Sequence, residues 1–319
     1  MEQADQDGTG FTLAHLSDVH LSPLPPIDLR YWNLKRFLGW LNWQRRRRHV
    51  YSRDVLDRLV DDLRAQAPDH IAVTGDLANL GLPAEHGIAL DWLGTLGTPD
   101  RVTAIPGNHD IYSGIGADPG TARWHPHMSA NTAAADHAIA EAMGADHFPF
   151  VRRFGKLAII ALNSAVQTRP FYAIGRLGPE QLGRLAKILD RLGAEGMMRV
   201  VLIHHPPLPG LSKKRHDLAD AAALADVLTR HGAELVLHGH EHREMLAWHP
   251  TPAGRIPIIG VPSASLAVPY KKEPLARYNL YRLQTGANRP RIELIARGLA
   301  EPGGPVVELA RKWIDSERA

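Results

Sequence analysis

Cysteine is absent from the 319 residues of the chain. Disulfide bonds, thiolate metal sites and cysteine nucleophiles are therefore excluded, and histidine, carboxylate and amide groups remain as potential metal ligands. No run approaches the ~20 consecutive apolar residues needed to cross a bilayer, so any membrane contact is expected to be peripheral. The N-terminal residues MEQADQDGTG lack the basic and apolar regions of a secretory signal, which predicts a cytoplasmic protein.

The chain also lacks a large excess of either charge. The chain has 37 basic and 34 acidic residues, a formal net charge of +3, with 18 histidines counted as neutral. A uniformly basic surface is not implied, so nucleic acid is not an expected partner. The length is sufficient for a large core, and a single domain over residues 1–319 is expected.

Short apolar runs bounded by turn residues predict buried strands, and stretches with helical periodicity lie between several of them. The predicted strands are Phe11–Leu16, Ile71–Thr74, Val102–Ile105, Leu157–Leu162, Val200–Ile203 and Leu235–Leu237. The predicted helices are Asp54–Gln66, Glu180–Leu192 and Leu218–His231. This alternation is typical of an α/β protein with helices outside a sheet.

The C-terminal part has a different pattern. Three strand-like runs, Ile256–Val261, Tyr278–Leu283 and Arg291–Ile295, follow one another without a helix between them. They predict a second, more antiparallel sheet, followed by a final helix at Val306–Ile314.

Two segments interrupt the alternation, and both follow predicted strand ends. The first insertion (residues 21–52) is far longer than the usual connection of about 2 to 6 residues. The second insertion (residues 112–150) contains an alanine-rich stretch, Asn131–Gly144, that is expected to be helical. Both insertions are expected to form lids or substrate walls.

Residue types that bind metals follow the predicted strands in short clusters. Each cluster alone has an ordinary structural explanation, such as a helix cap, a β-turn or an exposed histidine. Their shared place at strand ends indicates that the side chains converge on one edge of a sheet. The clusters are Asp18 and His20 in LSDVH, Asp76 in VTGD, Asn108, His109 and Asp110 in PGNHD, His204 and His205 in LIHHPP, and His240 and His242 in HGHEH.

In this order the clusters resemble the motifs of the calcineurin-like metallophosphoesterases, and they extend from Asp18 to His242. The resemblance implies a four-layer α/β/β/α sandwich of two mixed sheets flanked by helices, with a binuclear metal centre on the strand-end loops. It assigns Asp18, His20 and His242 to one metal, Asn108, His204 and His240 to the other, and Asp76 to both. The choice of His204 over His205 rests on the family alone.

The resemblance also implies a reaction. Two cations about 3.5 to 4 Å apart share a hydroxide that attacks phosphorus in line, and they offset the charge that develops on the oxygens. His109 resembles the leaving-group acid of the family, with Asp110 beside it as its orienting partner. Histidine, carboxylate and amide ligands suit Mn, Fe, Zn or Co, and the sequence leaves that choice open.

The first insertion combines three tryptophans with four consecutive arginines in DLRYWNLKRFLGWLNWQRRRRHVY. On a helix, Tyr31, Leu34, Phe37, Leu38 and Leu41 form one apolar face, Trp32, Trp40 and Trp43 spread along its flank, and Arg45–Arg48 close its end. Three interpretations remain open. The segment between Tyr31 and Arg48 is a peripheral membrane helix, a lid packed on the domain, or a source of arginines for a polyanionic substrate.

The expected function is that of a metal-dependent phosphoric ester hydrolase, a phosphodiesterase or pyrophosphatase acting on a small molecule. Two substrate classes are open: cyclic nucleotides, and nucleotide-linked lipids such as those cleaved by membrane-associated family members in lipid A synthesis. A nuclease is less favoured because no extended basic and stacking groove is evident. A noncatalytic scaffold is disfavoured because every expected ligand and His109 are present.

Overall fold

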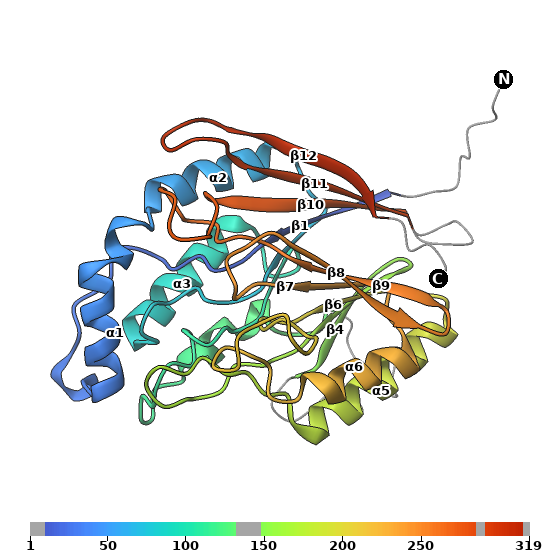
Figure 1. The fold of residues 1–319 in the computed structure, drawn as a ribbon, viewed down its shortest axis with the longest axis horizontal. Coiled ribbons are helices and arrows are strands. Elements are labelled where there is room, and N and C mark those ends of the chain that lie inside the picture. The colour runs from blue at the N-terminus through green and yellow to red at the C-terminus, as the bar shows by residue number, and fades with distance from the viewer. Residues whose placement is uncertain (1–9, 132–147, 285–290, 315–319) are drawn as a thin grey trace.

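The computed structural model describes residues 10–131, 148–284 and 291–314, which form two mixed six-stranded sheets with helices outside them (Figure 1). The first sheet has the spatial order β12-β11-β10-β1-β2-β3. Its strands β1, β2 and β3 are parallel, and the other three extend it in antiparallel pairs. The strands are β1 (Gly10–Leu16), β2 (His70–Val73), β3 (Val102–Ala104), β10 (Arg277–Gln284), β11 (Arg291–Leu299) and β12 (Val306–Ile314).

The second sheet has the order β4-β5-β6-β7-β9-β8. Strands β5, β6, β7 and β9 are parallel, whereas β4 and β8 are antiparallel edge strands. The strands are β4 (Phe150–Phe154), β5 (Leu157–Ala161), β6 (Met198–Leu202), β7 (Leu235–His238), β8 (Met245–Thr251) and β9 (Gly254–Gly260).

Alternation along the central strands produces the layers. On β5, Leu157 and Ile159 belong to the core that also holds residues of the first sheet, whereas Ala158 and Ile160 pack with α5 and α6. This is the pattern of a strand buried on both faces. The predicted four-layer α/β/β/α sandwich is therefore confirmed, with α2 and α3 outside the first sheet and α5 and α6 outside the second.

The helices have local reasons for their positions. Helix α2 (Arg53–Ala65) begins after Ser52, whose hydroxyl accepts a hydrogen bond from the Val55 amide, and it buries an apolar face. Helix α5 (Gly178–Ala194) likewise buries leucines and an isoleucine at helical spacing. Two further helices are α3 (Pro83–Leu96), which begins with a proline in its first turn, and α6 (Ala221–His231).

The C-terminal region differs from the sequence prediction in two respects. Strand β9 pairs with β7 and β10 pairs with β1, so these strands complete the two existing sheets and do not form a separate antiparallel sheet. The predicted helix at Val306–Ile314 is wrong, because this segment is β12, paired antiparallel with β11 at the sheet edge. Its mixed apolar and charged residues fit a helical period, but the segment pairs through its backbone with β11 and is therefore extended.

The first insertion forms the short 3-10 helix η1 (Leu29–Tyr31), helix α1 (Leu34–Arg45) and the 3-10 helix η2 (Arg47–His49). Helix α1 stands at the margin of the molecule (Figure 1). Its predicted apolar face is not its packing face, because Leu34 and Phe37 are exposed whereas Arg36 and Trp43 are buried. In the second insertion the structure describes the 3-10 helix η3 (Gly120–His127), and most of the predicted Asn131–Gly144 helix lies outside the described residues.

Asp62 on α2 connects this helix to the first sheet. Its carboxylate accepts two hydrogen bonds of 2.8 Å from the Arg297 guanidinium and one of 2.6 Å from the Tyr278 hydroxyl. Burial raises the pKa of Asp62, but the bonds from Arg297 and Tyr278 outweigh it and hold the pKa below its usual value. The carboxylate is therefore charged in the folded protein at neutral pH.

We expect Asp62→Asn to lower the free energy of unfolding by about 2 kcal/mol at pH 7, because charged hydrogen bonds are lost. Since the folded pKa is depressed, the contribution of Asp62 is complete above the unfolded value of about 4 and is lost as the pH falls below it. Urea unfolding at pH 7 and at several values below pH 4 measures this. A difference between the two proteins that stays constant over this range would contradict the assignment.

Candidate metal centre

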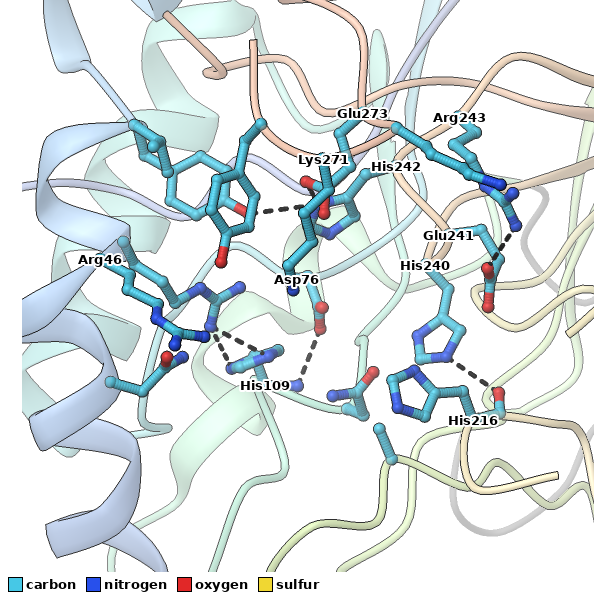
Figure 2. A pocket seen from close by; sticks show the side chains of 18 of the residues that line it. Arg46, Asp76, His109, His216, His240, Glu241, His242, Arg243, Lys271 and Glu273 are labelled. Atoms are coloured by element: carbon cyan, nitrogen blue, oxygen red, sulfur yellow. Dashed lines mark hydrogen bonds and ion pairs between the residues drawn. The ribbon is translucent and has the colours of Figure 1, made fainter. Parts of the chain in front are cut away.

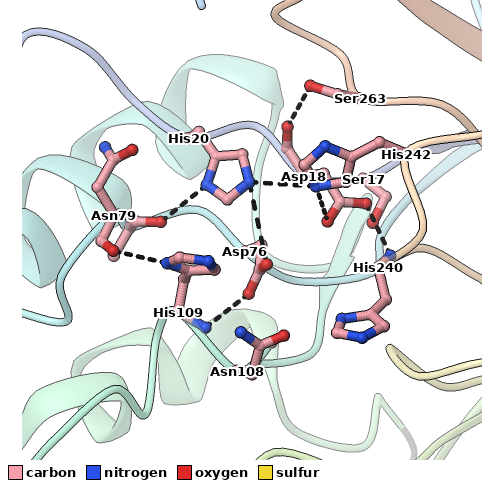
Figure 3. A network of polar contacts seen from close by, with 12 residues as sticks. Ser17, Asp18, His20, Asp76, Asn79, Asn108, His109, His240, His242 and Ser263 are labelled. Atoms are coloured by element: carbon pink, nitrogen blue, oxygen red, sulfur yellow. Dashed lines mark hydrogen bonds and ion pairs between the residues drawn. The ribbon is translucent and has the colours of Figure 1, made fainter. Parts of the chain in front are cut away.

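The predicted metal-binding residues follow β1, β2, β3, β6 and β7, at the carboxyl ends of parallel strands. Figure 3 shows six of them close together: Asp18, His20, Asp76, Asn108, His240 and His242. They form two clusters, and in each the potential ligand atoms lie within 4.8 Å of one another. Asp76 belongs to both clusters. The first cluster is Asp18, His20, Asp76 and His242, and the second is Asp76, His204 and His240.

The histidines of the first cluster have defined orientations. The Nδ1 atom of His20 faces the carbonyl of Ala78 at 3.1 Å, and that of His242 faces the Glu273 carboxylate at 3.0 Å. Each Nδ1 therefore donates, which leaves Nε2 to face the cluster. The two Nε2 atoms are 3.4 Å apart, and Nε2 of His242 lies 3.1 Å from Oδ1 of Asp18. Three potential ligand atoms, the Nε2 atoms of His20 and His242 and Oδ1 of Asp18, therefore point to the same place, as the ligands of a metal ion do.

The second cluster follows the same principle. His204 donates from Nδ1 to the carbonyl of Thr74 at 2.7 Å, and His240 donates from Nε2 to the carbonyl of His216 at 2.9 Å. The free nitrogens, Nε2 of His204 and Nδ1 of His240, lie 3.3 Å apart. Oδ1 of Asn108 lies 3.3 Å and Oδ1 of Asp76 lies 3.5 Å from Nε2 of His204. Asn108 therefore joins this cluster through its amide oxygen.

Buried negative charge also favours a cation here. Asp18 and Asp76 are at most 1 % exposed. Burial raises the pKa of each carboxyl, but the neighbouring histidines outweigh it and lower the pKa values below the usual one. Burial alone would lower the pKa of the His204 ring, but the charges of Asp76 and Asp18 outweigh burial and raise this pKa to about 9. Protonated histidine thus balances the buried negative charge of Asp18 and Asp76, and metal ions at the same place would balance it equally. The residues therefore fit a binuclear centre of nitrogen and oxygen ligands.

The backbone bends sharply at these residues. Left-handed φ angles occur at Asp18 (53°), His20 (42°), Asp76 (55°), His240 (71°) and His242 (50°). Non-glycine residues rarely adopt this region, and each instance carries a conformational cost of about 1 to 3 kcal/mol. The hydrogen bonds of the strand-end loops hold the strained residues in place, as between the Asp18 amide and the Gly75 carbonyl at 3.0 Å.

The predicted catalytic pair is separated in the structure. The His109 ring lies at the site, but its Nδ1 donates to the carbonyl of Asn79 at 2.6 Å. The Asp110 carboxylate instead accepts backbone hydrogen bonds from Asp76, Ala78 and Gly107 at 2.8 to 2.9 Å. The expected orientation of His109 by Asp110 is thus corrected, because consecutive side chains point in different directions in this turn. Asp110 holds the loops that carry the site.

The two adjacent histidines after β6 point to different places. His204 faces Asp76 and Asn108, whereas Nδ1 of His205 lies 2.8 Å from the Ser164 hydroxyl. Both are fully buried. The geometry places the His204 nitrogen within the second cluster.

A cavity of about 620 Å³ opens above the two clusters. Asp76, Asn108 and His109 belong to its lining, which is otherwise mostly basic but includes Glu241 and Glu273. Figure 2 shows Asp76 and His109 with several of the charged residues around them. Arg46 stands on the side of α1, and Lys271 and Arg243 stand on other sides of the cavity. Its remaining basic lining residues are Arg47, Lys213 and Lys272. An anionic small molecule fits this lining.

Residues 11–244 match the calcineurin-like phosphoesterase family. The chain belongs to this family. Two curated relatives match about three quarters of the chain. A protein named probable cyclic nucleotide phosphodiesterase from Synechococcus sp. is 27% identical over 75% of this chain and 76% of its own length. A cAMP/cGMP dual specificity phosphodiesterase from Mycobacterium tuberculosis is 26% identical over 76% of this chain and 65% of its own length.

The fold is also that of a solved structure, a dimetal phosphatase from Danio rerio. It aligns with a TM-score of 0.61 and 15% identity, covering 96% of this chain and 99% of the other. The expected fold and family membership are thereby confirmed.

Three residues outside the family motifs also contact the candidate metal centre of this family member. Tyr51 places its hydroxyl 3.2 Å from Nδ1 of His242, which also bonds Glu273. Arg47 of the first insertion lies 2.8 Å from His20 through Nη2 and 3.1 Å from Nε2 of His109 through Nη1. The sequence indicated Arg47 only as one of four consecutive arginines, and no sequence motif indicated that Glu273 would lie at this site.

The first insertion is attached to the rest of the fold by Arg36, which is fully buried. Its five guanidinium N–H groups all donate to backbone carbonyls at 2.9 to 3.2 Å, four of them outside the insertion and one, that of Tyr31, within it. Gly39 allows α1 to approach closely, since an added Cβ would lie 2.4 Å from the Tyr112 hydroxyl oxygen. The acceptors of Arg36 are the carbonyls of Tyr31, Leu80, Gly81, Ser113 and Gly114.

We expect Arg36→Lys to lower the free energy of unfolding by about 2 to 4 kcal/mol, because one ammonium group cannot satisfy carbonyls on several sides. Urea unfolding measures the loss, and limited proteolysis reports cleavage within residues 21–52. Arg30→Lys is the matched control, since the side chain of Arg30 is 71% exposed. Equal stability and protection in the two variants would refute the role of Arg36.

Proposed function

We propose that this protein is a metal-dependent phosphodiesterase that hydrolyses a small phosphodiester or a related pyrophosphate. The observation that carries the proposal is the pair of donor clusters joined by the buried Asp76 carboxylate. Two ions held in this way supply an activated water and neutralise charge on the phosphoryl oxygens. Family membership and the basic cavity support the same reaction.

The proposed ligand sets follow the two clusters. Asp18, His20 and His242 would hold one ion, Asn108, His204 and His240 would hold the other, and Asp76, which belongs to both clusters, would contribute to each. The donors are imidazole nitrogens, carboxylates and one amide, a set that suits Mn, Fe, Zn or Co. The carbonyls of Ala78 and Thr74 and the Glu273 carboxylate fix the histidine rings from behind.

His109 is proposed as the proton donor to the leaving oxygen. Burial and the Arg47 charge lower the pKa of its ring to about 3 in the free protein, so the ring is neutral there. An anionic phosphoester beside Arg47 would offset that charge and favour the protonated ring. The role therefore belongs to the substrate complex.

A cyclic nucleotide is the first proposed substrate. The two relatives that match most of the chain are named as cyclic nucleotide phosphodiesterases, one as probable. The cavity of about 620 Å³ is within the usual range for small-molecule sites, and its basic lining suits a phosphate.

A nucleotide-linked lipid is the second candidate, and the surface of the first insertion favours it. Leu29, Leu34 and Phe37 are 86%, 67% and 48% exposed. The rings of Trp32 and Phe37 lie 5.7 and 6.3 Å from the ring of Trp40. We name these five residues the α1 surface. Among the described residues, no helix is long and apolar enough to span a bilayer.

The charge around the α1 surface suits an anionic membrane. Residues 29–53 include no acidic residue, and exposed Arg45 and Arg46 follow the apolar side chains. Arg46 also lines the cavity, so a molecule held at the α1 surface would have its headgroup near the candidate metal centre. Trp43 is 9% exposed and belongs to the protein interior.

We expect metal-stripped protein reloaded with Mn, Fe, Zn or Co to hydrolyse bis(p-nitrophenyl) phosphate faster than p-nitrophenyl phosphate. Asn108→Ala should lower kcat/KM by about 100-fold or more, because a ligand is lost. His109→Ala should affect a cyclic nucleotide more than bis(p-nitrophenyl) phosphate, because p-nitrophenolate departs without a proton.

His231→Ala is the control for this experiment, because His231 lies on the outer helix α6 and pairs with Asp190. Folded protein that binds metal yet cleaves none of these esters or a cyclic nucleotide would count against a phosphodiesterase. It would favour the lipid-linked pyrophosphate, which is then assayed directly, and the absence of that activity too would indicate a noncatalytic scaffold.

We expect the protein to cosediment with vesicles that contain phosphatidylglycerol and to bind pure phosphatidylcholine vesicles weakly. Leu34→Ser with Phe37→Ser should lower the partition coefficient by about tenfold or more, because two apolar side chains no longer enter the interface. Leu246→Ser is the matched control, since Leu246 is 40% exposed on β8. No binding by the parent, or equal binding by the double variant, would exclude the membrane interpretation.

A further inference from the structure

Arg47 differs from the other enclosed arginines in what its guanidinium contacts. Arg36 and Arg152, both at most 2% exposed, donate to backbone carbonyls. Arg47 instead donates to two imidazole rings, from Nη2 to His20 at 2.8 Å and from Nη1 to His109 at 3.1 Å. Its guanidinium carbon also lies 5.2 Å from the centre of the Tyr51 ring.

These contacts give the Arg47 guanidinium no carboxylate within ion-pair distance among the described residues, although the charge of Asp76 in the same cavity attracts it. Within residues 10–131, 148–284 and 291–314, no carboxylate forms an ion pair with Arg47. Arg47 is partly buried, and a partly desolvated guanidinium is stabilised by direct contact with an anion. Residues of the candidate metal centre line the cavity beside it, and a phosphoryl group bound there would supply that anion.

The position of Arg47 is also fixed by the fold. Helix α1 is attached through the five hydrogen bonds of Arg36 and buries Trp43, and η2 begins at Arg47 two residues after α1 ends. The carbonyl of Arg47 accepts hydrogen bonds from the amides of Val50 and Tyr51 at 3.1 and 3.0 Å. Its side chain is thus directed toward the site by structure on both sides.

We propose that Arg47 binds the phosphoryl group of the substrate, so that the first insertion contributes one wall of the phosphate site. This inference rests on the proposed phosphodiesterase function. A guanidinium offers two parallel N–H donors to phosphoryl oxygens, and it stabilises the charge that these oxygens gain during in-line attack. Nη2 now contacts Nε2 of His20, a proposed metal ligand, and a metal ion at that nitrogen would release Nη2 for the substrate.

The consecutive arginines 45–48 differ in exposure and contacts, and the proposal concerns Arg47 alone. Arg48 is exposed and bonds Gln44 and His49, and Arg45 is exposed at the end of α1. Arg47 faces His20 and His109. The sequence left three interpretations open for this segment: a membrane helix, a lid, or a source of arginines for an anionic substrate. The contacts of Arg47 favour the third for this residue.

The test compares Arg47→Ala, Arg47→Lys and the neighbouring control Arg48→Ala in the full-length, metal-loaded protein. We expect Arg47→Ala to lower kcat/KM for bis(p-nitrophenyl) phosphate by about 100-fold, with a fall in kcat. Arg47→Lys should recover part of the loss, since it restores charge without the paired donors. Millimolar guanidinium ion should partly restore Arg47→Ala, and Arg48→Ala should remain within about twofold of the parent.

Binding of inorganic phosphate, measured by titration calorimetry, provides a readout that is independent of turnover. We expect Arg47→Ala to weaken phosphate binding about tenfold or more while metal content and melting temperature stay unchanged. Phosphate affinity within twofold of the parent, or loss of metal from the variant, would overturn the proposal. If Arg47→Ala does not fold, Arg47→Lys and Arg47→Gln decide by the same two measurements.

The two proposals fail in different ways. A parent protein that cleaves no phosphodiester with any metal refutes the proposed function, and the phosphate titration still decides whether Arg47 binds a phosphoryl group. A parent that is active, with an equally active Arg47→Ala variant, refutes the role of Arg47 alone.

Discussion

The structure depends on the burial of a few carboxylates at the edge shared by the two sheets. Asp18 accepts the amide of His240 at 2.9 Å, and Asp76 accepts the amide of His109 at 2.8 Å. Asp110 and Glu85 accept further backbone amides from the loops after β2 and β3. Asp18, Asp76 and Asp110 therefore join chain segments that are distant in sequence, whereas Glu85 holds the loop just before its own helix. Of these groups, Asp18 and Asp76 have lowered pKa values and bring negative charge to the place where the histidine nitrogens converge. The same two carboxylates therefore hold loops together and favour a cation.

The sequence predicted the candidate centre better than the outer parts of the fold. Strand ends such as Leu16 and Val73 are marked by local apolar runs, and the polar residues after them can only gather at one sheet edge. The segment Val306–Ile314 was predicted as a helix because its apolar residues fit both periods, and only pairing with β11 made it a strand. Long-range pairing of this kind leaves no local signal.

The direction of individual side chains was equally inaccessible from sequence. Asp110 follows His109 directly, yet its carboxylate binds amides of other loops and the ring bonds the Asn79 carbonyl. In α1 the apolar positions predicted a packing face, but Arg36 occupies the interior because five backbone carbonyls surround it. Such outcomes depend on carbonyl groups of segments far along the chain. Patterns of side-chain polarity do not encode those positions.

The attachment of the first insertion through Arg36 has a consequence for how this protein can change over evolution. The groups that receive the guanidinium are main-chain carbonyls, and a side-chain substitution at Leu80 or Ser113 does not delete them. The five hydrogen bonds of Arg36 therefore do not depend on the side chains of the docking surface, whereas the insertion needs an arginine at position 36 and a glycine at position 39. The outward face of a segment attached in this manner is not fixed by the attachment, so the α1 surface can change in sequence while the candidate metal centre stays the same.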